Sequence, residues 1–393
     1  MGMTAAQVAD VVKDVAGDLI KKWEQERKES GMQDLVSAIR SINVPARDPR
    51  KEEKGAKAGR FIRAVAAGKT PDGAAKYARE KWGDLEMEKV LAASDASVGG
   101  VLVPAQFSSE IIELLRERAI FRSLGPRIVP MPTGSMTMPK ITGGATASYI
   151  GENQNFPVTG LTTGQIKLSW KKLAALVPMS NDLLRFDVVD ADMLVRDDVV
   201  AAMAWREDQA FIRDDGTQFT PTGVYYQALA ANRVAMTATP TLAKITADLS
   251  SAVLRLRNAN VRMINPAWIM APRTEMCLKT IRDTNGNLVF ATEMNAGRLF
   301  GMPYASSNVI PINISGTQSE VYLLDMADVL VGEANTLEVS ASDTAAYYDG
   351  SSVVSAFSLD QTVVKVLAHH DLAVRHAESI TVITEVTWAP GAP

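Results

Sequence analysis

The sequence predicts an α+β fold, and two kinds of pattern support this prediction. Residues 187–212 and 240–260 place apolar residues at spacings of three and four, which is the period of an amphipathic helix. Residues 126–180 and 362–386 instead contain short alternating or wholly apolar runs, and Gly, Asn, Pro and Thr separate the runs of the first segment. Such runs are typical of strands and hairpins. We therefore expect a few long helices on mixed, mostly antiparallel strands.

Length and composition indicate a soluble globular protein made in the cytoplasm. The chain has 393 residues, of which 47% are hydrophobic and 22% are charged. This length predicts two or three folding units at about 150 residues each. The single cysteine, Cys277, excludes a disulfide framework within the chain and fits a reducing compartment. The N-terminus lacks the pattern of a signal peptide, and no segment approaches the roughly 18 apolar residues of a membrane span, so no membrane partner is expected.

Charge is unevenly distributed along the chain. Residues 1–93 contain 18 Lys/Arg and 15 Asp/Glu, a net charge of +3, whereas the remainder contains 23 and 30, a net charge of −7. Dedicated nucleic-acid-binding proteins gain affinity by neutralising phosphates, so an acidic body argues against that class. It is compatible with a wall that encloses DNA without binding a particular sequence.

The first 92 residues form a charged, mainly helical region. Apolar residues at helical spacing predict a helix over 4–45, with a narrow stripe that suits pairing with another helix. Residues 41–59 have the composition of a linker, with two prolines, two glycines and dense mixed charge. A further helical stretch, broken at Gly68–Gly73, ends near Ala92. Small residues follow in 93–104, and the main domain boundary is expected there.

A search for catalytic or cofactor motifs finds no phosphate-binding glycine loop, paired-cysteine motif, HExxH motif or serine-hydrolase elbow. Asp214–Gly216 is interpreted as a helix-ending turn. His369, His370 and His376 are interpreted as ordinary residues of a strand, because neighbouring strand residues point to opposite faces. Cys277 is interpreted as a small buried hydrophobic residue. No cofactor, metal site or catalytic residue is predicted, and the protein is not expected to be an enzyme.

The order of segments resembles that of the Hong Kong 97-type major capsid proteins of tailed bacteriophages. The resemblance is spread over residues 100–390 and is carried by collinearity rather than by one motif. ASDASVGGVLVPAQFSSEIIELLR is similar to the start of the family's shell domain, and GENQNFPVT to the tip of its extended loop. LAALVPMSNDLLR resembles the strand that returns to the spine helix. AWREDQAFIRDDGTQFTPTGVYY, INPAWIMAPRTEMCLKTIRDTNGNLVF and LFGMPYASSNVIP resemble segments that follow.

The resemblance implies a Hong Kong 97-type capsid fold with axial and peripheral domains, an extended hairpin loop and an N-terminal arm. It assigns 1–92 to a delta-like helical scaffolding region and 93–125 to the arm and first helix. Residues 126–180 become the extended loop, and 181–393 the peripheral and axial domains, with a spine helix at 187–212. The axial domain is expected to include the region near 305–360.

The resemblance also implies a function, which is self-assembly into the icosahedral head of a tailed phage. The expected partners are copies of the chain in pentamers and hexamers, a portal and a maturation protease, with a decoration protein left open. Double-stranded DNA would be enclosed but not bound sequence-specifically. The chain would be assembled in the host cytoplasm and would reside in the virion. The alternatives are an encapsulin-type nanocompartment shell and, more remotely, a metal-dependent hydrolase that uses the histidines.

Three groups of residues are assigned roles by the resemblance. The loop tip is expected to contact a neighbouring subunit through Glu152, Asn153, Phe156 and Leu161. The spine helix would pack through Val189, Met193, Met203 and Phe211. Maturation cleavage is expected in the region of Lys89, Ala92 and Asp95. Some members of the family join a loop-tip lysine to an asparagine of a neighbour, but residues 151–164 contain no lysine and residues 336–393 no asparagine. We therefore expect non-covalent joints.

Overall fold

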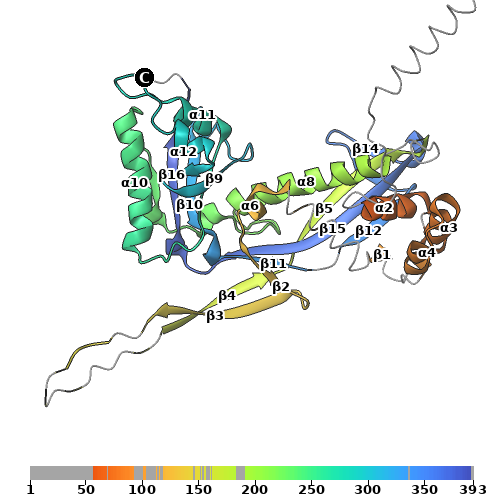
Figure 1. The fold of residues 1–393 in the computed structure, drawn as a ribbon. Coiled ribbons are helices and arrows are strands. Elements are labelled where there is room, and N and C mark those ends of the chain that lie inside the picture. The colour runs from red at the N-terminus through yellow and green to blue at the C-terminus, as the bar shows by residue number, and fades with distance from the viewer. Residues whose placement is uncertain are drawn as a thin grey trace, which may run out of the picture. The chain divides into compact units, whose positions relative to one another are not determined.

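The computed structural model of the chain divides into two compact units, Met1–Glu53 and Lys54–Pro393. The described residues all belong to the second unit, whose elements are labelled in Figure 1. They are 56–68, 70–92, 101–102, 118–144, 147–150, 162–182, 191–334 and 337–390, with the single residues 112, 115, 152, 155 and 160.

Three helices begin the described part of the chain: α2 (Ala56–Gly68), α3 (Pro71–Trp82) and α4 (Leu85–Ala92). The side chain of Thr70 accepts a hydrogen bond from the Gly73 N–H at 3.1 Å and so caps the start of α3. The helix ends at Gly83, whose φ of 65° lies in the left-handed region that favours glycine. These local signals fold the segment into a three-helix module, which we call the helical module (residues 56–92).

The first sheet is built around one long strand, β15 (Gln361–Val374), as Figure 1 shows. The strand order is β1-β12-β15-β11-β2, and β5 also pairs with β15. The partners are β1 (Val101–Leu102), β12 (Glu338–Ser342), β11 (Val329–Glu333), β2 (Arg127–Pro130) and β5 (Lys171–Ser180). The first ten residues of β15 pair antiparallel with β5, and its last residues pair with β11. β15 therefore connects the part of the sheet that contains β5 with the part that contains β11.

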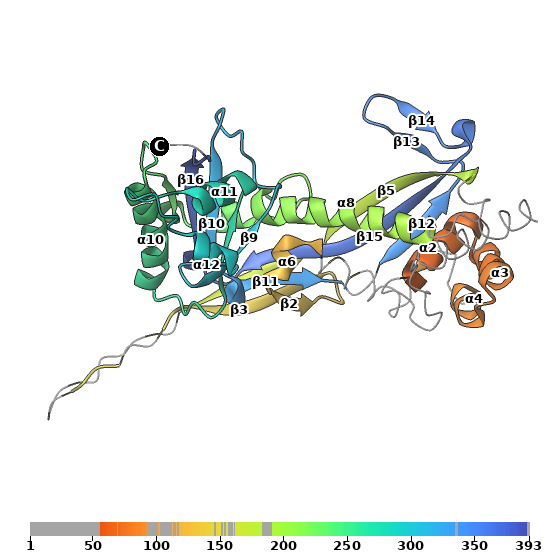
Figure 2. The same ribbon diagram turned by 45° about the horizontal axis from the view of Figure 1, so that its top comes forward.

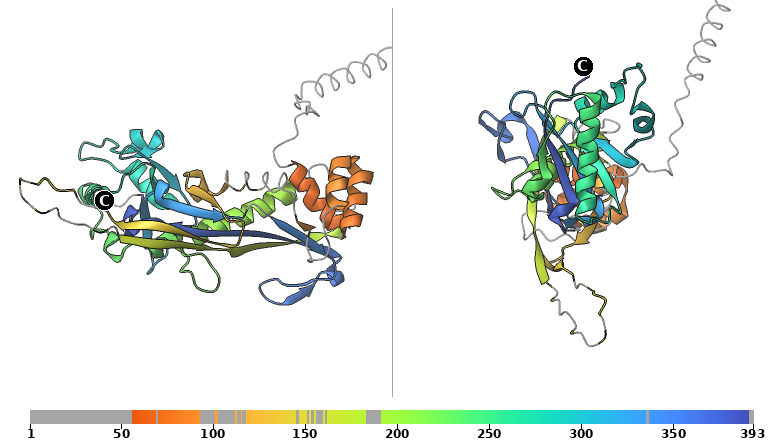
Figure 3. Two further views of the ribbon diagram at one scale, coloured as in Figure 1. Left: turned by 90° about the horizontal axis from the view of Figure 1, so that it is seen from below. Right: turned by 90° about the vertical axis from the view of Figure 1, so that its left-hand side faces the viewer.

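The second sheet has the strand order β6-β16-β10-β7-β9-β8. Its strands are β6 (Arg233–Ala235), β16 (Ile380–Val386), β10 (Ser319–Asp325), β7 (Pro266–Met270), β9 (Met302–Ser306) and β8 (Arg298–Leu299). Helices α10 (Leu242–Asn258), α11 (Pro272–Thr280) and α12 (Ala291–Asn295) lie beside it. The right panel of Figure 3 shows α10 along one face of the sheet, and its buried Leu249 and Leu256 share an apolar cluster with Trp268 of β7.

Helix α8 (Ala191–Arg213) joins the two sheets. The left panel of Figure 3 shows it running along the long strands of the first sheet, and its C-terminal end belongs to the cluster that also contains Ile269 and Tyr322 of the second sheet. Short helices α6 (Ile120–Ser123) and α9 (Val224–Gln227) pack against it.

Two hairpins extend from these sheets. Strands β3 (Ser135–Gly143) and β4 (Thr162–Ser169) pair antiparallel and form the stem of the long loop. The Ser169 N–H donates to Asp371 of β15 at 2.7 Å, which anchors this stem to the first sheet. A second, shorter hairpin consists of β13 (Ala346–Tyr348) and β14 (Val353–Ser355). Figure 2 shows it projecting beside the ends of β5 and β15.

Several predicted elements are confirmed. The antiparallel β3–β4 hairpin lies within the predicted loop 126–180, and α10 lies within the predicted helix 240–260. The β-rich tail predicted over 362–386 corresponds to β15 and β16. The predicted helix 187–212 corresponds to α8 from Ala191 onward, and residues 187–190 lie outside the described residues.

Three boundaries differ from the predictions. The predicted linker 41–59 is wrong at its end, because α2 already begins at Ala56. The structure divides at Glu53–Lys54 rather than after residue 92, because the helical module contacts α8, β12 and β15. The region near 305–360, expected to belong to one axial domain, is split: β10 lies in the second sheet, whereas β11 and β12 lie in the first. Long-range strand pairing, which local patterns do not specify, causes this last difference.

Candidate functional site

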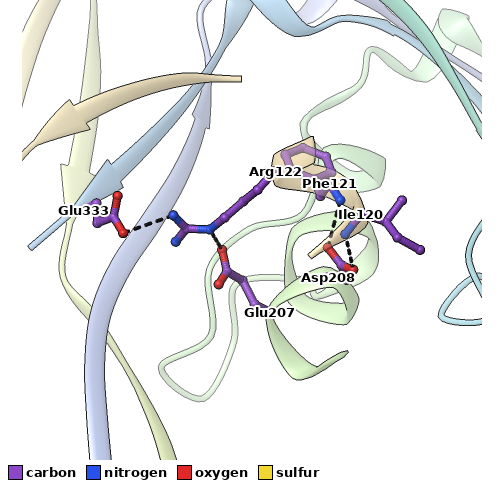
Figure 4. A network of polar contacts seen from close by, with 6 residues as sticks. All are labelled: Ile120, Phe121, Arg122, Glu207, Asp208 and Glu333. Atoms are coloured by element: carbon purple, nitrogen blue, oxygen red, sulfur yellow. Dashed lines mark hydrogen bonds and ion pairs between the residues drawn. The ribbon is translucent and has the colours of Figure 1, made fainter. Parts of the chain in front are cut away.

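Four charged side chains are buried where α6, α8 and β11 meet, as Figure 4 shows. They are Arg122 of α6, Glu207 and Asp208 of α8, and Glu333 of β11. None of the four is more than 7% exposed. Charged residues are rarely buried unless they are paired, so this group, which we call the buried charge cluster, must be held together by specific contacts.

Arg122 lies at the centre of the buried charge cluster. Its Nε donates a hydrogen bond to Oε1 of Glu207, and its Nη1 donates to Oε1 of Glu333 at 3.0 Å. Charge-assisted hydrogen bonds of this kind are stronger than those between neutral groups. A single guanidinium group therefore connects α6 to both α8 and the first sheet.

Asp208 fixes the same short helix from the other side. Its carboxylate accepts hydrogen bonds from the Ile120 N–H at 2.9 Å and from the Phe121 N–H at 3.0 Å. Both N–H groups belong to the first turn of α6, where a helix has no internal acceptors for them. The ring of Phe121 also packs edge-on against Phe211 of α8, with ring centroids 5.5 Å apart. Neighbouring residues of α8, Glu207 and Asp208, thus hold α6 through different bonds.

Burial changes the acid–base properties of the buried charge cluster. Burial alone would lower the pKa of Arg122, but the carboxylates of Glu207 and Glu333 raise it, so the guanidinium group stays charged. Burial raises the pKa of Asp208 to about 6, although its two backbone donors oppose the change. Burial lowers the pKa of His370, whose ring packs against Phe211 with centroids 5.1 Å apart. The histidine is therefore neutral at pH 7.

The cluster is built to connect elements rather than to catalyse a reaction. The acids are engaged by arginine or backbone donors, and the neighbouring strand residues His369 and His370 point to different sides. His369 packs on Trp170, with ring centroids 5.2 Å apart, whereas His370 packs on Phe211. Within the described ranges, no group of three or more His, Cys, Asp or Glu residues could hold a metal ion.

The structure agrees with the interpretations of Cys277 and of the turn after α8. Cys277 is buried in α11, and burial raises the pKa of its thiol. Gly216 has a φ of 80°, as expected for the turn that follows α8.

Among the helices of the described residues, none combines the length and the apolar character that a membrane span requires.

The residues predicted for the loop tip are only partly described. Glu152 is exposed, while Asn153, Phe156 and Leu161 lie outside the described residues. Their expected contact with a neighbouring subunit therefore stays a prediction.

Of the predicted spine-helix residues, Met203 and Phe211 are buried on α8. They belong to different apolar clusters, one beneath the helical module and one between the two sheets. Met193 lies within α8, and Val189 lies outside the described residues. In the predicted cleavage region, Lys89 and Ala92 belong to α4, and Asp95 lies outside the described residues.

The buried charge cluster was missed by the sequence analysis. Its one local signal is the acidic pair Glu207–Asp208 between the apolar residues Met203 and Phe211, which places carboxylates near the apolar side of a helix. The partners could not be found in this way, because Arg122 and Glu333 are 211 positions apart.

Replacing Arg122 with methionine should strongly destabilise the protein. The substitution leaves Glu207 and Glu333 buried without their cation, and breaking a buried ion pair in this way costs about 3–5 kcal/mol. Changing Glu207 and Glu333 to glutamine in the same chain should recover much of this loss. Thermal unfolding of the assembled protein measures both effects. Arg118→Met is the control, because Arg118 forms a partly exposed ion pair with Asp197 and its loss should cost at most about 1 kcal/mol. Equal effects of Arg118→Met and Arg122→Met would contradict the assignment.

Asp208 should make stability depend on pH in a defined direction. The folded protein keeps this proton up to about pH 6, whereas an unfolded aspartate releases it near pH 4. The folded state therefore binds more protons between these values, and the contribution of Asp208 to stability is lost as the pH rises through them. Relative to Asp208→Asn, the free energy of unfolding of the native protein should rise by about 2 kcal/mol between pH 7.5 and pH 4.5. Unfolding temperatures of both proteins across this range provide the measurement, and a constant difference would refute the assignment.

Comparison with known proteins identifies the family of this chain. The model of the phage capsid family matches residues 99–384. The major capsid protein of Klebsiella oxytoca phage phiKO2 is 40% identical over 346 residues, which cover 86% of this chain and 80% of that protein. The capsid polyprotein of Pseudomonas phage PAJU2 is 27% identical over 262 residues, covering 64% of this chain and 38% of that protein.

Solved structures resemble the fold at low sequence identity. A chain from Mycobacterium phage Cain matches with a TM-score of 0.54 and 16% identity, over 68% of this chain and 90% of that one. A chain from the capsid of a native GTA particle matches with a TM-score of 0.52 and 16% identity, over 74% and 93%. The family match and the 40% identical relative show that this chain belongs to the phage capsid family, as a structural protein of the virion shell and not an enzyme.

Proposed function

We propose that the chain is the major capsid protein of a tailed phage. It assembles as pentamers and hexamers into an icosahedral head around double-stranded DNA, and residues 1–92 act as an internal scaffold during assembly. The observation that supports the scaffold role is an apolar cluster that the helical module shares with α8 and the first sheet. These elements belong to residues 93–393, which we call the body of the shell unit.

The shared cluster is large on both sides. The helical module contributes Phe61, Ile62, Ala64, Val65, Ala66, Ala74, Ala75, Ala78, Met87 and Leu91, each no more than 5% exposed. The body contributes Met179 of β5, Val199, Val200, Met203 and Ala204 of α8, Leu337 and Val339 around β12, and Val364 and Val366 of β15. The helical module therefore covers an apolar face formed by α8 and the first sheet.

By covering this face, the helical module would act as a scaffold. Burying apolar side chains stabilises the subunit by roughly 1.5–3 kcal/mol per large side chain. A subunit that keeps the helical module would hold α8 and the first sheet in one arrangement while shells form. Removal of the module would expose the face and allow the same elements to rearrange.

The position of α4 supports a cleavage site at the C-terminal end of the proposed region. Lys89, Leu91 and Ala92 lie in α4, and Leu91 is fully buried, so a protease would have to unfold α4 to cut there. The proposed cut therefore lies after Ala92, the last residue of α4. Loss of residues 1–92 would remove a net charge of +3 and leave a body of −7 that tolerates dense DNA rather than binding it.

We base the remaining contacts of the proposed shell on the long loop and on membership of the capsid family. The tip around Glu152, Asn153, Phe156 and Leu161 would lie across a neighbouring subunit and pack against it. The joints would be non-covalent. A portal and a maturation protease would be further partners, and a decoration protein is left open.

The scaffold proposal can be tested with two substitutions in the helical module. Phe61 is fully buried in the shared cluster, and a buried Phe→Ala change costs about 3–5 kcal/mol, so Phe61→Ala should reduce the yield of closed shells several-fold. Leu85→Ala is the matched control, because Leu85 belongs to the same module but is 61% exposed, and the yield should be unchanged. Sedimentation and negative-stain microscopy measure the yield.

A complementation experiment separates a scaffold from a segment needed only for folding. A chain that begins at residue 93 should give aggregates or irregular particles, and co-expression of residues 1–92 as a separate polypeptide should restore closed shells. Closed, regular shells from the shortened chain alone, at the yield of the full chain, would refute the proposal.

A further inference from the structure

The β13–β14 hairpin and the turn that follows it carry four exposed apolar side chains. Tyr348 and Val353 pair directly across the hairpin and so share a face, and they are 67% and 74% exposed. Phe357 and Leu359, which follow β14, are 76% and 54% exposed. An isolated two-stranded hairpin is at best marginally stable in water, and clustered exposed apolar residues mark interaction sites. We call Tyr348, Val353, Phe357 and Leu359 the hairpin patch.

The segment that carries the hairpin patch is acidic in sequence. Residues 343–360 contain Asp343, Asp349 and Asp360, and no lysine or arginine. Asp343 and Asp360 already interact with other groups, which leaves Asp349 at the exposed turn. Asp349 caps the exposed turn of the hairpin by accepting hydrogen bonds from the Ser351 and Ser352 N–H groups at 2.8 and 2.7 Å. A surface that covers the hairpin patch should therefore be apolar and cationic.

A surface with these properties lies on the first sheet of the same protein. Lys172, Ala174 and Leu176 alternate along β5 and are exposed, whereas Leu173, Ala175 and Val177 face the apolar cluster on the other side. Lys365 of β15 lies directly opposite Leu176 and is also exposed. Leu176 is itself 48% exposed. We call Lys172, Ala174, Leu176 and Lys365 the sheet strip.

The two lysines of the sheet strip are available to a partner. Within the part of the chain that the structure describes, neither forms an ion pair with a carboxylate closer than 4.0 Å. The half-buried Glu338 of β12, opposite Leu367, is an acid on the same face, so the strip keeps a net positive charge. The strip therefore complements the acidic, apolar hairpin in both charge and hydrophobicity.

We propose that in the assembled shell the hairpin patch of one copy packs on the sheet strip of a neighbouring copy. The inference rests on membership of the capsid family, whose members act in many copies, and not on the proposed scaffold role. A contact between two hairpin patches is disfavoured because it would bring the exposed turns of both copies, each with Asp349, together. A contact between different patches closes into a ring when the rotation between copies allows it.

Engineered cysteines test this contact. The native Cys277 is buried, so it does not compete for cross-linking. Shells of the full chain carrying both Leu176→Cys and Val353→Cys should give disulfide-linked oligomers on non-reducing denaturing gels. Either substitution alone should give monomers only. A control pair, Ile264→Cys with Val353→Cys, uses a residue next to the second sheet that is more exposed than Leu176 (67% against 48%) and should also give monomers.

Two results would overturn the proposal. One is the absence of linked oligomers from double-cysteine shells that assemble normally. The other is dimer formation by Val353→Cys alone, which would show hairpin-to-hairpin contact.

Native shells provide a second measurement that needs no substitution. Carbodiimide treatment followed by mass spectrometry should link Lys365 or Lys172 to Asp343 or Asp349 of another copy. Asp283 is a matched control, because it also caps an exposed turn, accepting from the Asn285 and Asn287 N–H groups at 2.9 and 2.8 Å. Links from these lysines to Asp283 without links to Asp343 or Asp349 would refute the proposed contact, as would the absence of any link from the strip to the hairpin.

Discussion

The apolar face formed by α8, β12 and β15 is the constraint on which the rest of the shell unit depends. Its residues, such as Val199, Met203 and Val364, must be covered, because exposed contiguous apolar surface promotes unwanted association. The helical module covers this face in the structure. The face therefore links two properties of a capsid subunit, the stability of its body and the role proposed for its N-terminal region.

The buried charge cluster complements this apolar packing at the other end of α8. Apolar contacts are not directional, and alone they would allow α6 to slide on α8. The bonds from Arg122 and to Asp208 fix its position, because each depends on distance and angle. Removing four charged side chains from water is costly, so the cluster contributes more to a unique arrangement than to net stability. The result is a subunit in which the chain leading into the body is held to both the long helix and the first sheet.

Much of the fold could be predicted from local patterns, and what could not depends on contacts between distant residues. The alternating and apolar runs in 362–386 correctly indicated the strands β15 and β16, and helical spacing indicated α10. The start of α2 was misassigned because AKAG resembles a linker, although its alanines and glycine are small enough to continue a helix that buries Phe61. The buried charge cluster was missed for a related reason. The acids Glu207 and Asp208 lie near apolar residues of their own helix, but local spacing does not identify Arg122 and Glu333, which are distant in the sequence. The family itself was recognised only through the order of many weak segments.

The central claim is that the helical module shares one apolar core with the body of the shell unit, and hydrogen exchange on shells of the full chain tests it most directly. If the claim is correct, the backbone amides of 59–66 in α2 should be protected to a degree similar to those of 199–204 in α8, and both should lose protection together as denaturant is added. Rapid exchange in 59–66 while 199–204 remains protected would show that the module is not part of this core, and it would contradict the account.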